Sequence, residues 1–243
     1  PKYYFMSGSC NKKTFTKKNL SKISNSLKKE QDRYGIFLCG GDTTFSNHLS
    51  FSITSVGFSK NIIYRNKAKL HDDIYVTGNL GDSFVGLKIL QNKIRINNKL
   101  RSYFVKKYFE PEIQIHLTKE LFKFANSSID ISDGLIDDLE KMINKQKLSY
   151  KIWEEQIPIS KNLYKYLKNN EFKKSNFISN GDDYQILFTA SADKSRIIKN
   201  TSKKLGLKIS RIGQINSNNE KSVLVDKKGK YLLVKNSGYK HQF

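Results

Sequence analysis

The stretch that most constrains the fold spans residues 129–135 and reads Ile-Asp-Ile-Ser-Asp-Gly-Leu. Ile129 and Ile131 alternate with polar residues, which is the period-two pattern of a β-strand. Ser132 and Asp133 are residue types that cap helix N-termini, and apolar residues then recur at helical spacing. The sequence therefore predicts a buried strand that turns directly into an amphipathic helix.

This strand–helix junction brings two carboxylates and a hydroxyl together. Asp130 and Asp133 repel each other unless a hard cation such as Mg²⁺ lies between them. The N-terminus of the following helix also favours phosphate oxygens, because its first backbone N–H groups have no partner within the helix. The residues therefore indicate a Mg²⁺–nucleotide site, whose other half must come from elsewhere in the chain.

The composition is that of a globular protein. The chain has 243 residues, of which 37% are hydrophobic and 12% aromatic, so it can bury a core in one large domain or two smaller ones. No apolar run is long enough to cross a membrane, and the N-terminus has no signal-peptide pattern. Cys10 and Cys39 match no metal spacing, so we expect reduced thiols and a cytoplasmic protein. The chain opens without Met inside a predicted strand, so we expect that residues are missing upstream.

The net charge of +22 raises the question of nucleic-acid binding. Of the 44 basic residues only six are Arg, and Lys is enriched along the whole chain together with Asn and Ile. This distribution indicates a general compositional bias, and no aromatic-interleaved binding motif is present. We therefore expect no specific nucleic-acid partner. The four histidines are scattered, which argues against a histidine-based metal site.

The apolar patterns predict an α/β fold in two parts, with a boundary near residue 70. The first part, residues 1–69, is expected to hold strands at residues 3–9, 36–39 and 51–53 and a helix at 16–35. The continuously apolar run 36–39 is typical of a central strand. The second part, residues 70–243, is expected to hold strands near 74–76, 129–131, 150–153, 184–188 and 209, a hairpin over 223–234, and helices near 84–90, 112–125, 135–143, 163–167 and 194–204.

Four motifs stand at predicted strand ends: 40–44 (Gly-Gly-Asp-Thr-Thr), 72–78, 129–135 and 181–184 (Gly-Asp-Asp-Tyr). Taken singly, each has an ordinary structural interpretation as well as a functional one. The first is also a common turn, the third also an ordinary helix cap, and the fourth an acidic turn before a strand. Asp72 and Asp73 fit a surface turn better than a metal site. Residues 77–82 fit a tight turn and helix start better than a phosphate loop, and Arg65 fits either a connector or a phosphate clamp.

In this order and at these intervals the motifs resemble those of thiamine-monophosphate kinase. This family belongs to the superfamily of aminoimidazole ribonucleotide synthetase, selenophosphate synthetase and HypE. In the family the second motif reads DDxYVTGxLGD, the third IDISDGL and the fourth GGEDYEL. The resemblance covers nearly the whole chain. It implies a two-domain fold like that of aminoimidazole ribonucleotide synthetase, in which an N-terminal ATP-binding part pairs with its copy in a homodimer and a C-terminal α/β part packs beside it.

The resemblance also implies the reaction, in which ATP and thiamine monophosphate give ADP and thiamine diphosphate. Direct in-line phosphoryl transfer needs alignment and charge neutralisation, and it needs no covalent nucleophile. No catalytic side chain is therefore expected beyond those that position Mg²⁺ and phosphate. By resemblance the Mg²⁺ ligands are Asp42, Asp130 and Asp133, the ATP contacts are Gly41, Asp42, Arg65 and Ser132, and the thiamine monophosphate contacts are Asp182 and Tyr239.

The chain departs from the family pattern in three places. Asn180 and Asp182 stand where the family has Gly and Glu, and the usual Pro-x-Pro-Arg is reduced to Pro111 and Glu112. A family segment with a Gly-Asp-Asp metal motif is absent, so the N-terminal domain is expected to be incomplete and this chain alone a weak catalyst or none. Two other hypotheses stay open: another ATP-using enzyme of the superfamily, or a non-catalytic dimerisation or nucleic-acid-binding fragment.

Overall fold

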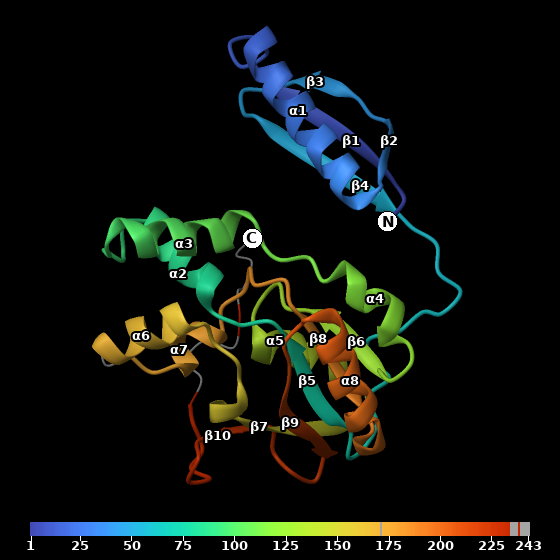
Figure 1. Ribbon diagram of the computed structural model, residues 1–243, viewed down its shortest axis with the longest axis vertical. Coiled ribbons are helices and arrows are strands. Elements are labelled where there is room, and N and C mark those ends of the chain that lie inside the picture. Colours follow the sequence, from blue (N-terminus) through green and yellow to red (C-terminus); the bar gives the residue numbers. More distant parts are fainter. Residues whose placement is uncertain (171, 234–237, 239–243) are drawn as a thin grey trace. The chain divides into compact units, whose positions relative to one another are not determined.

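The computed structural model describes residues 1–170, 172–233 and 238 (Figure 1). The chain divides into two compact units, Pro1–Ile62 and Ile63–Phe243. The roles assigned to residues 1–69 and 70–243 stay predictions.

The first unit is a small sheet with one long helix. Its elements are β1 (Tyr3–Cys10), α1 (Lys17–Tyr34), β2 (Phe37–Gly40), β3 (Thr43–Phe45) and β4 (Ser50–Val56). β1 pairs in parallel with β2 and β3 and antiparallel with β4. The predicted ends of α1 are confirmed, because the Thr16 side chain accepts a hydrogen bond from the Asn19 N–H and Gly35 ends the helix in the left-handed conformation.

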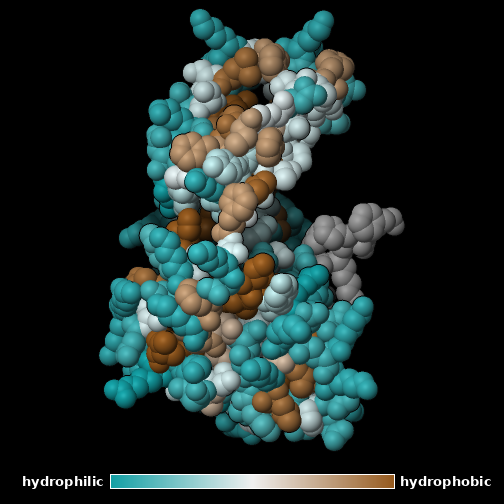
Figure 2. Space-filling view, turned by 90° about the vertical axis from the view of Figure 1, so that its right-hand side faces the viewer, coloured by the Kyte–Doolittle hydropathy of each residue, from teal (hydrophilic) through white to brown (hydrophobic). Residues whose placement is uncertain are grey.

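One prediction for this unit is wrong, since β2 is not a buried central strand. β1 occupies the centre, and every residue of β2 is exposed. Other large apolar side chains of the unit are exposed as well, among them Phe5, Phe45, Phe51 and Ile53, and hydrophobic surface is visible on this unit in Figure 2. The continuous apolar run at 36–39 therefore reflects apolar surface on this unit rather than burial on both faces of a sheet.

The second unit is built on a mixed sheet. Within the described residues its strands lie in the order β10-β7-β9-β5-β8-β6. The pairings are antiparallel except that between β10 and β7. The strands are β5 (Asp73–Thr77), β6 (Ser127–Asp130), β7 (Leu148–Trp153), β8 (Ile186–Ala190), β9 (Ile209–Ser217) and β10 (Val223–Val225). Of the predicted hairpin over 223–234, an isolated antiparallel bridge joins Val225 and Tyr231, and residue 234 lies outside the described residues.

The helices of this unit are α2 (Asp82–Leu90), α3 (Asn98–Phe109), α4 (Ile115–Leu121), α5 (Leu135–Ile143), α6 (Lys161–Asn169), α7 (Ser175–Ile178) and α8 (Ser195–Leu205), with single 3₁₀ turns at Glu154–Gln156 and Ala192–Lys194. The sequence patterns predict neither α3 nor α7. α3 buries Phe104 alone among its own residues, so it has little apolar periodicity to detect. No described helix is both long and apolar enough to span a membrane.

Helices cover both faces of the larger sheet, as alternate residues of β5 show. Ile74 and Val76 lie in a core cluster with Leu135, Leu139 and other apolar residues of α5. Tyr75 points to the opposite face, into a cluster formed with α4 and α8, and its ring stacks on Phe188 with 5.2 Å between centroids. A third cluster joins α2, α3 and α6. The predicted α/β class is therefore confirmed.

Asp72 and Asp73 correct another prediction, because they do not form a surface turn. Both are buried. Asp72 accepts hydrogen bonds from the Lys69 N–H (2.9 Å) and the Asn126 side chain (2.9 Å), and Asp73 pairs with Arg211 at 2.6 Å. The two carboxylates therefore hold the start of β5 in place.

Candidate active site

The two acidic motifs of the second unit are joined by backbone hydrogen bonds beyond the ends of β6 and β8. The Ile131 N–H donates to the Gln185 oxygen at 2.9 Å, and the Tyr184 N–H donates back to the Ile131 oxygen at 2.8 Å. The Asp182 N–H then donates to the Ser132 oxygen at 2.9 Å. This ladder brings motif 129–135 and motif 181–184 together at one end of the sheet.

Two glycines permit this close approach of the motifs. A Cβ atom on Gly181 would lie 1.8 Å from the Ser132 oxygen, so a side chain there would collide with backbone. A Cβ atom on Gly134 would lie 2.5 Å from the Ser179 oxygen, and Gly134 also has a φ of 131°, which disfavours other residues. Gly181 therefore lies against the backbone of motif 129–135, and Gly134 lies against the backbone just before motif 181–184.

The N-terminus of α5 is capped from inside the helix, which corrects the prediction that Ser132 or Asp133 caps it. The capping position is Gly134, and it makes no side-chain cap. Instead one oxygen of Asp138 accepts the N–H groups of Ser132 (2.9 Å), Asp133 (2.9 Å) and Gly134 (3.1 Å). Burial raises the pKa of Asp138, while these backbone hydrogen bonds and Lys141 act in the opposite direction. The three N–H groups are therefore already taken and do not await a phosphate.

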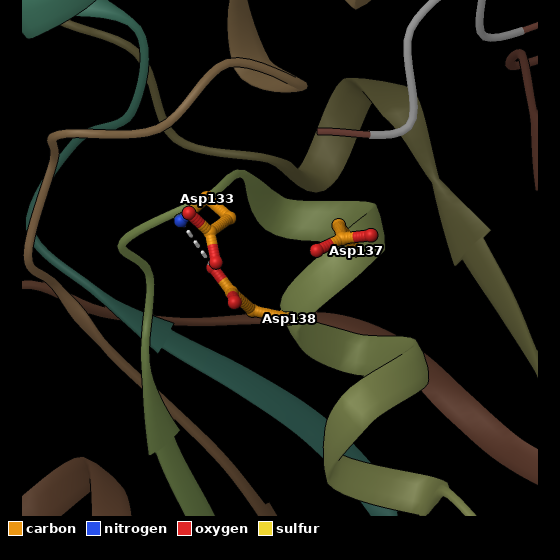
Figure 3. Close-up of side chains that lie close together, drawn as sticks. All are labelled: Asp133, Asp137 and Asp138. Carbon is orange, nitrogen blue, oxygen red and sulfur yellow. Dashed lines mark hydrogen bonds between the residues drawn. The ribbon is translucent and has the colours of Figure 1, made fainter. Parts of the chain in front are cut away.

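Asp133, Asp137 and Asp138 form a compact carboxylate group, with oxygen atoms within 4.8 Å of one another (Figure 3). Lys141 contacts all three: it pairs with Asp133, lies 2.6 Å from Asp137 and lies 3.3 Å from Asp138. Burial alone would lower the pKa of Lys141, but the hydrogen bonds to these carboxylates outweigh it and raise the pKa above its usual value. Lys141 therefore stays protonated and offsets part of the negative charge.

The donors at this end of the sheet fit a hard divalent cation. The side chains of Asp133 and Asp137 are 26% and 21% exposed, and Asp130 is exposed at the end of β6. Carboxylate oxygens that a solvated ion can reach are the ligands that Mg²⁺ prefers. Sequence reasoning missed Asp137 and Asp138, although acidic residues in the first turn of a helix are a recognisable signal. Asp130 lies outside the compact group, so its place among the metal ligands stays a prediction.

Asp182 and Tyr184 face the same region from the other motif. Burial raises the pKa of Asp182, and the charge of Asp133 adds to this rise. Burial also raises the pKa of Tyr184, with further contributions from the charges of Asp182, Asp130 and Asp133. Asp182 and Tyr184 have φ values of 68° and 48°, which are uncommon for residues other than glycine and are often found at functional sites. Sequence reasoning assigned Tyr184 to a strand and missed it as a site residue.

The residues between them hold the acidic turn in place. Asp183 is buried and accepts the Gly81 N–H at 2.8 Å, and its burial raises the pKa of its carboxyl to about 8. The Gln185 side-chain oxygen accepts the Thr77 hydroxyl at 2.8 Å. Residues 182–185 thus alternate between residues that face the acidic region, Asp182 and Tyr184, and residues that anchor the turn, Asp183 and Gln185. The predicted turn and helix start at 77–82 is confirmed by the helix α2 that begins at Asp82.

Three more predicted site residues stand earlier in the chain than these motifs. Gly41 and Asp42 belong to the first unit, where the exposed Asp42 carboxylate accepts the N–H of Thr43 at 2.7 Å. Arg65 is exposed near the start of the second unit. A joint site of Asp42 with Asp130 and Asp133 stays a prediction.

The predicted substrate contact Tyr239 lies outside the described residues. Its neighbour Gly238 lies against the start of α5, because a Cβ atom on Gly238 would come within 2.4 Å of the Asp137 Cβ and 2.9 Å of the Asp133 backbone oxygen. The substrate contact of Tyr239 stays a prediction.

Comparison with known proteins gives consistent relatives, although no family model matches the chain. The thiamine-monophosphate kinase of Buchnera aphidicola subsp. Schizaphis graminum is 37% identical over 225 residues, which cover 91% of this chain and 69% of that protein. The solved structure of the thiamine-monophosphate kinase from Stenotrophomonas maltophilia has a TM-score of 0.82 at 26% identity, with 96% of this chain and 73% of that chain covered. The structure of AaThiL complexed with AMPPCP and TMP has a TM-score of 0.84 at 24% identity and covers 100% of this chain and 74% of its own.

Proposed function

Because this chain belongs to the thiamine-monophosphate kinase family, we propose that it transfers a phosphoryl group from ATP to thiamine monophosphate, giving ADP and thiamine diphosphate. The observation that carries this conclusion is the junction of motifs 129–135 and 181–184, which presents carboxylates from both motifs at one end of a sheet. A relative of the same fold has been solved with AMPPCP and TMP, an ATP analogue and a phosphate acceptor.

The residues of the site suit phosphoryl transfer between two phosphate chains. The acceptor oxygen of a phosphate monoester is already ionised, so the protein has to align the reactants and neutralise charge rather than remove a proton. When bound, Mg²⁺ would supply positive charge that neutralises the phosphate oxygens. The residues proposed to hold it are Asp42, Asp130 and Asp133, and those proposed to contact ATP are Gly41, Asp42, Arg65 and Ser132.

Asp182 and Tyr239 are proposed to contact thiamine monophosphate. A carboxylate at position 182 suits this substrate, since the thiazolium ring of thiamine carries a positive charge. The turn that holds Asp182 is anchored by the residues that follow it, through Asp183 to Gly81 and through Gln185 to Thr77. The carboxylate is therefore presented by an anchored turn, and it reaches less far from the backbone than the family's Glu.

The proposed reaction is tested by ADP release that depends on thiamine monophosphate and Mg²⁺, measured on the gene product that carries this sequence. We expect turnover by the wild type and a loss of about a hundredfold or more in Asp130→Asn, since removal of a carboxylate weakens Mg²⁺–ATP binding. The control is Asp193→Asn, the same change at an exposed surface carboxylate. Circular dichroism separates loss of binding from unfolding, because an unfolded Asp130→Asn protein would show that the carboxylate is structural.

Two outcomes would contradict the proposal. ATP turnover with another acceptor, and none with thiamine monophosphate, would indicate a different enzyme of the superfamily. Salt-sensitive RNA binding without nucleotide binding would indicate a non-catalytic fragment.

The first unit is proposed to mediate homodimerisation. Its exposed apolar side chains include Phe5, Phe37, Phe45, Phe51 and Ile53, and they come from all four strands of its sheet. Monomeric proteins rarely expose so many large apolar side chains on one small unit. A second copy of the same unit is the partner that the family resemblance implies, and it would bury these side chains against an identical surface.

A further inference from the structure

The proposed function leaves the role of Lys141 open. Lys141 lies in the last turn of α5, and its ammonium group is placed among carboxylates of three different positions. It pairs with Asp133 from the loop before the helix and with Asp137 and Asp138 from the preceding helical turn. Its side chain is 38% exposed, so the ammonium group can move into solvent without unfolding the helix.

The three carboxylates depend on Lys141 to different degrees. Asp138 is fully buried and is fixed by three backbone N–H groups, whichever cation is nearby. Asp137 is the i,i+4 neighbour of Lys141 on the same helix, so the helix backbone keeps their side chains next to each other. Asp133 comes from outside the helix, and its carboxylate meets Lys141 across the helix N-terminus. The contact with Asp133 is thus the one that can be exchanged.

We propose that Lys141 is an exchangeable counter-ion of Asp133, whose ammonium group neutralises this carboxylate in the metal-free protein and is displaced by a divalent cation. The proposal rests on the proposed function, because it takes Asp133 as a metal ligand. After displacement the ammonium group keeps its contacts with Asp137 and Asp138, so it is not left unpaired.

A positive charge that stays beside the site also repels the entering cation. Lys141 therefore lowers the affinity of Asp133 for a free divalent ion and favours a cation that arrives already bound to the phosphates of a nucleotide. A unit charge about 5 Å from a divalent ion in a water-like dielectric changes the affinity by about tenfold. Lys141 is in this sense a positioning residue that couples metal binding to nucleotide binding.

The test is Mn²⁺ binding without nucleotide, measured by electron paramagnetic resonance of free Mn²⁺ on the full chain. We expect Lys141→Met to bind Mn²⁺ about tenfold more tightly than the wild type. Lys141→Arg keeps the charge and should bind within about twofold of the wild type. The matched control is Lys145→Met, which removes the same charge from an exposed residue just beyond α5. A second readout is the unfolding temperature in EDTA, which should fall in Lys141→Met and recover with Mn²⁺.

The outcomes separate this proposal from the one on which it rests. Equal Mn²⁺ affinity of wild type and Lys141→Met would overturn the counter-ion role alone. The counter-ion role would also be overturned if Lys141→Met binds Mn²⁺ more tightly and this higher affinity persists when Asp133→Asn is added, because the cation would then bind elsewhere. Absence of Mn²⁺ binding in every variant would overturn the metal role of Asp133 itself. Where Lys141→Met does not fold, Lys141→Gln gives the same comparison with a polar side chain.

Discussion

Asp183 shows how one residue of the acidic turn sets a pH dependence of stability. Burial raises the pKa of the Asp183 carboxyl to about 8 in the folded protein, whereas an Asp in an unfolded chain has a pKa of about 3.9. Between these values the unfolded chain releases the proton and the folded chain keeps it, so the free energy of unfolding falls as the pH rises from about 4 to about 8. Asp183→Asn removes this titration, and its side-chain oxygen can still accept the Gly81 N–H.

We therefore expect the stability of Asp183→Asn to vary less between pH 5 and pH 8 than that of the wild type. At pH 8 the variant should be more stable by at least about 1 kcal/mol, since each pKa unit corresponds to about 1.4 kcal/mol. Urea denaturation at the two pH values measures the difference. Asp193→Asn, at an exposed carboxylate, should leave the change in unfolding free energy between the two pH values the same as in the wild type. If Asp183→Asn keeps the pH dependence of the wild-type unfolding free energy, another titratable group causes that dependence.

At the scale of elements, the junction of β6 with the 181–184 turn depends on close backbone packing. Gly181→Ala would place a methyl group 1.8 Å from the Ser132 oxygen, so the two motifs must separate. We expect a loss of about 1–3 kcal/mol in the free energy of unfolding and weaker binding of thiamine monophosphate. Gly206→Ala is the control, because it places Ala at a left-handed helix end with open space around it.

This control should cost about 1 kcal/mol and leave substrate binding unchanged. Thermal unfolding and calorimetric titration with thiamine monophosphate measure both effects. Unchanged stability and binding in Gly181→Ala would show that the two motifs are not coupled through this contact.

Local patterns in the sequence predicted most elements of the fold and the place of the acidic site. The alternation at 129–131 and the helical spacing after it depend on neighbouring residues, so they could be read from the chain. The cap formed by Asp138 could not, because it requires knowing that this side chain points back toward the loop. The exposure of β2 could not be predicted either, since an apolar run does not reveal which surface covers it.

At the scale of the whole molecule, the exposed apolar surface of the first unit predicts a dimer in solution. Light scattering after size exclusion should give twice the chain mass of 28.1 kDa. Ile53→Lys places a charge on the exposed surface of β4 and should weaken association at least about tenfold, because a buried lysine loses its hydration. Ile197→Lys, at an exposed position of α8, should leave the dimer intact. A monomeric wild type would contradict the proposal.

The three consecutive N–H groups that donate to one oxygen of Asp138 have a consequence for the entropy cost of ligand binding. A single carboxylate already accepts the three N–H groups of the loop before α5, so this loop is ordered before any substrate binds. Little conformational entropy is then left to lose on binding, so the preorganised loop increases affinity without adding contacts. The acidic end of this sheet is thus preformed for binding, and the exchange proposed for Lys141 moves a side chain while the backbone stays in place.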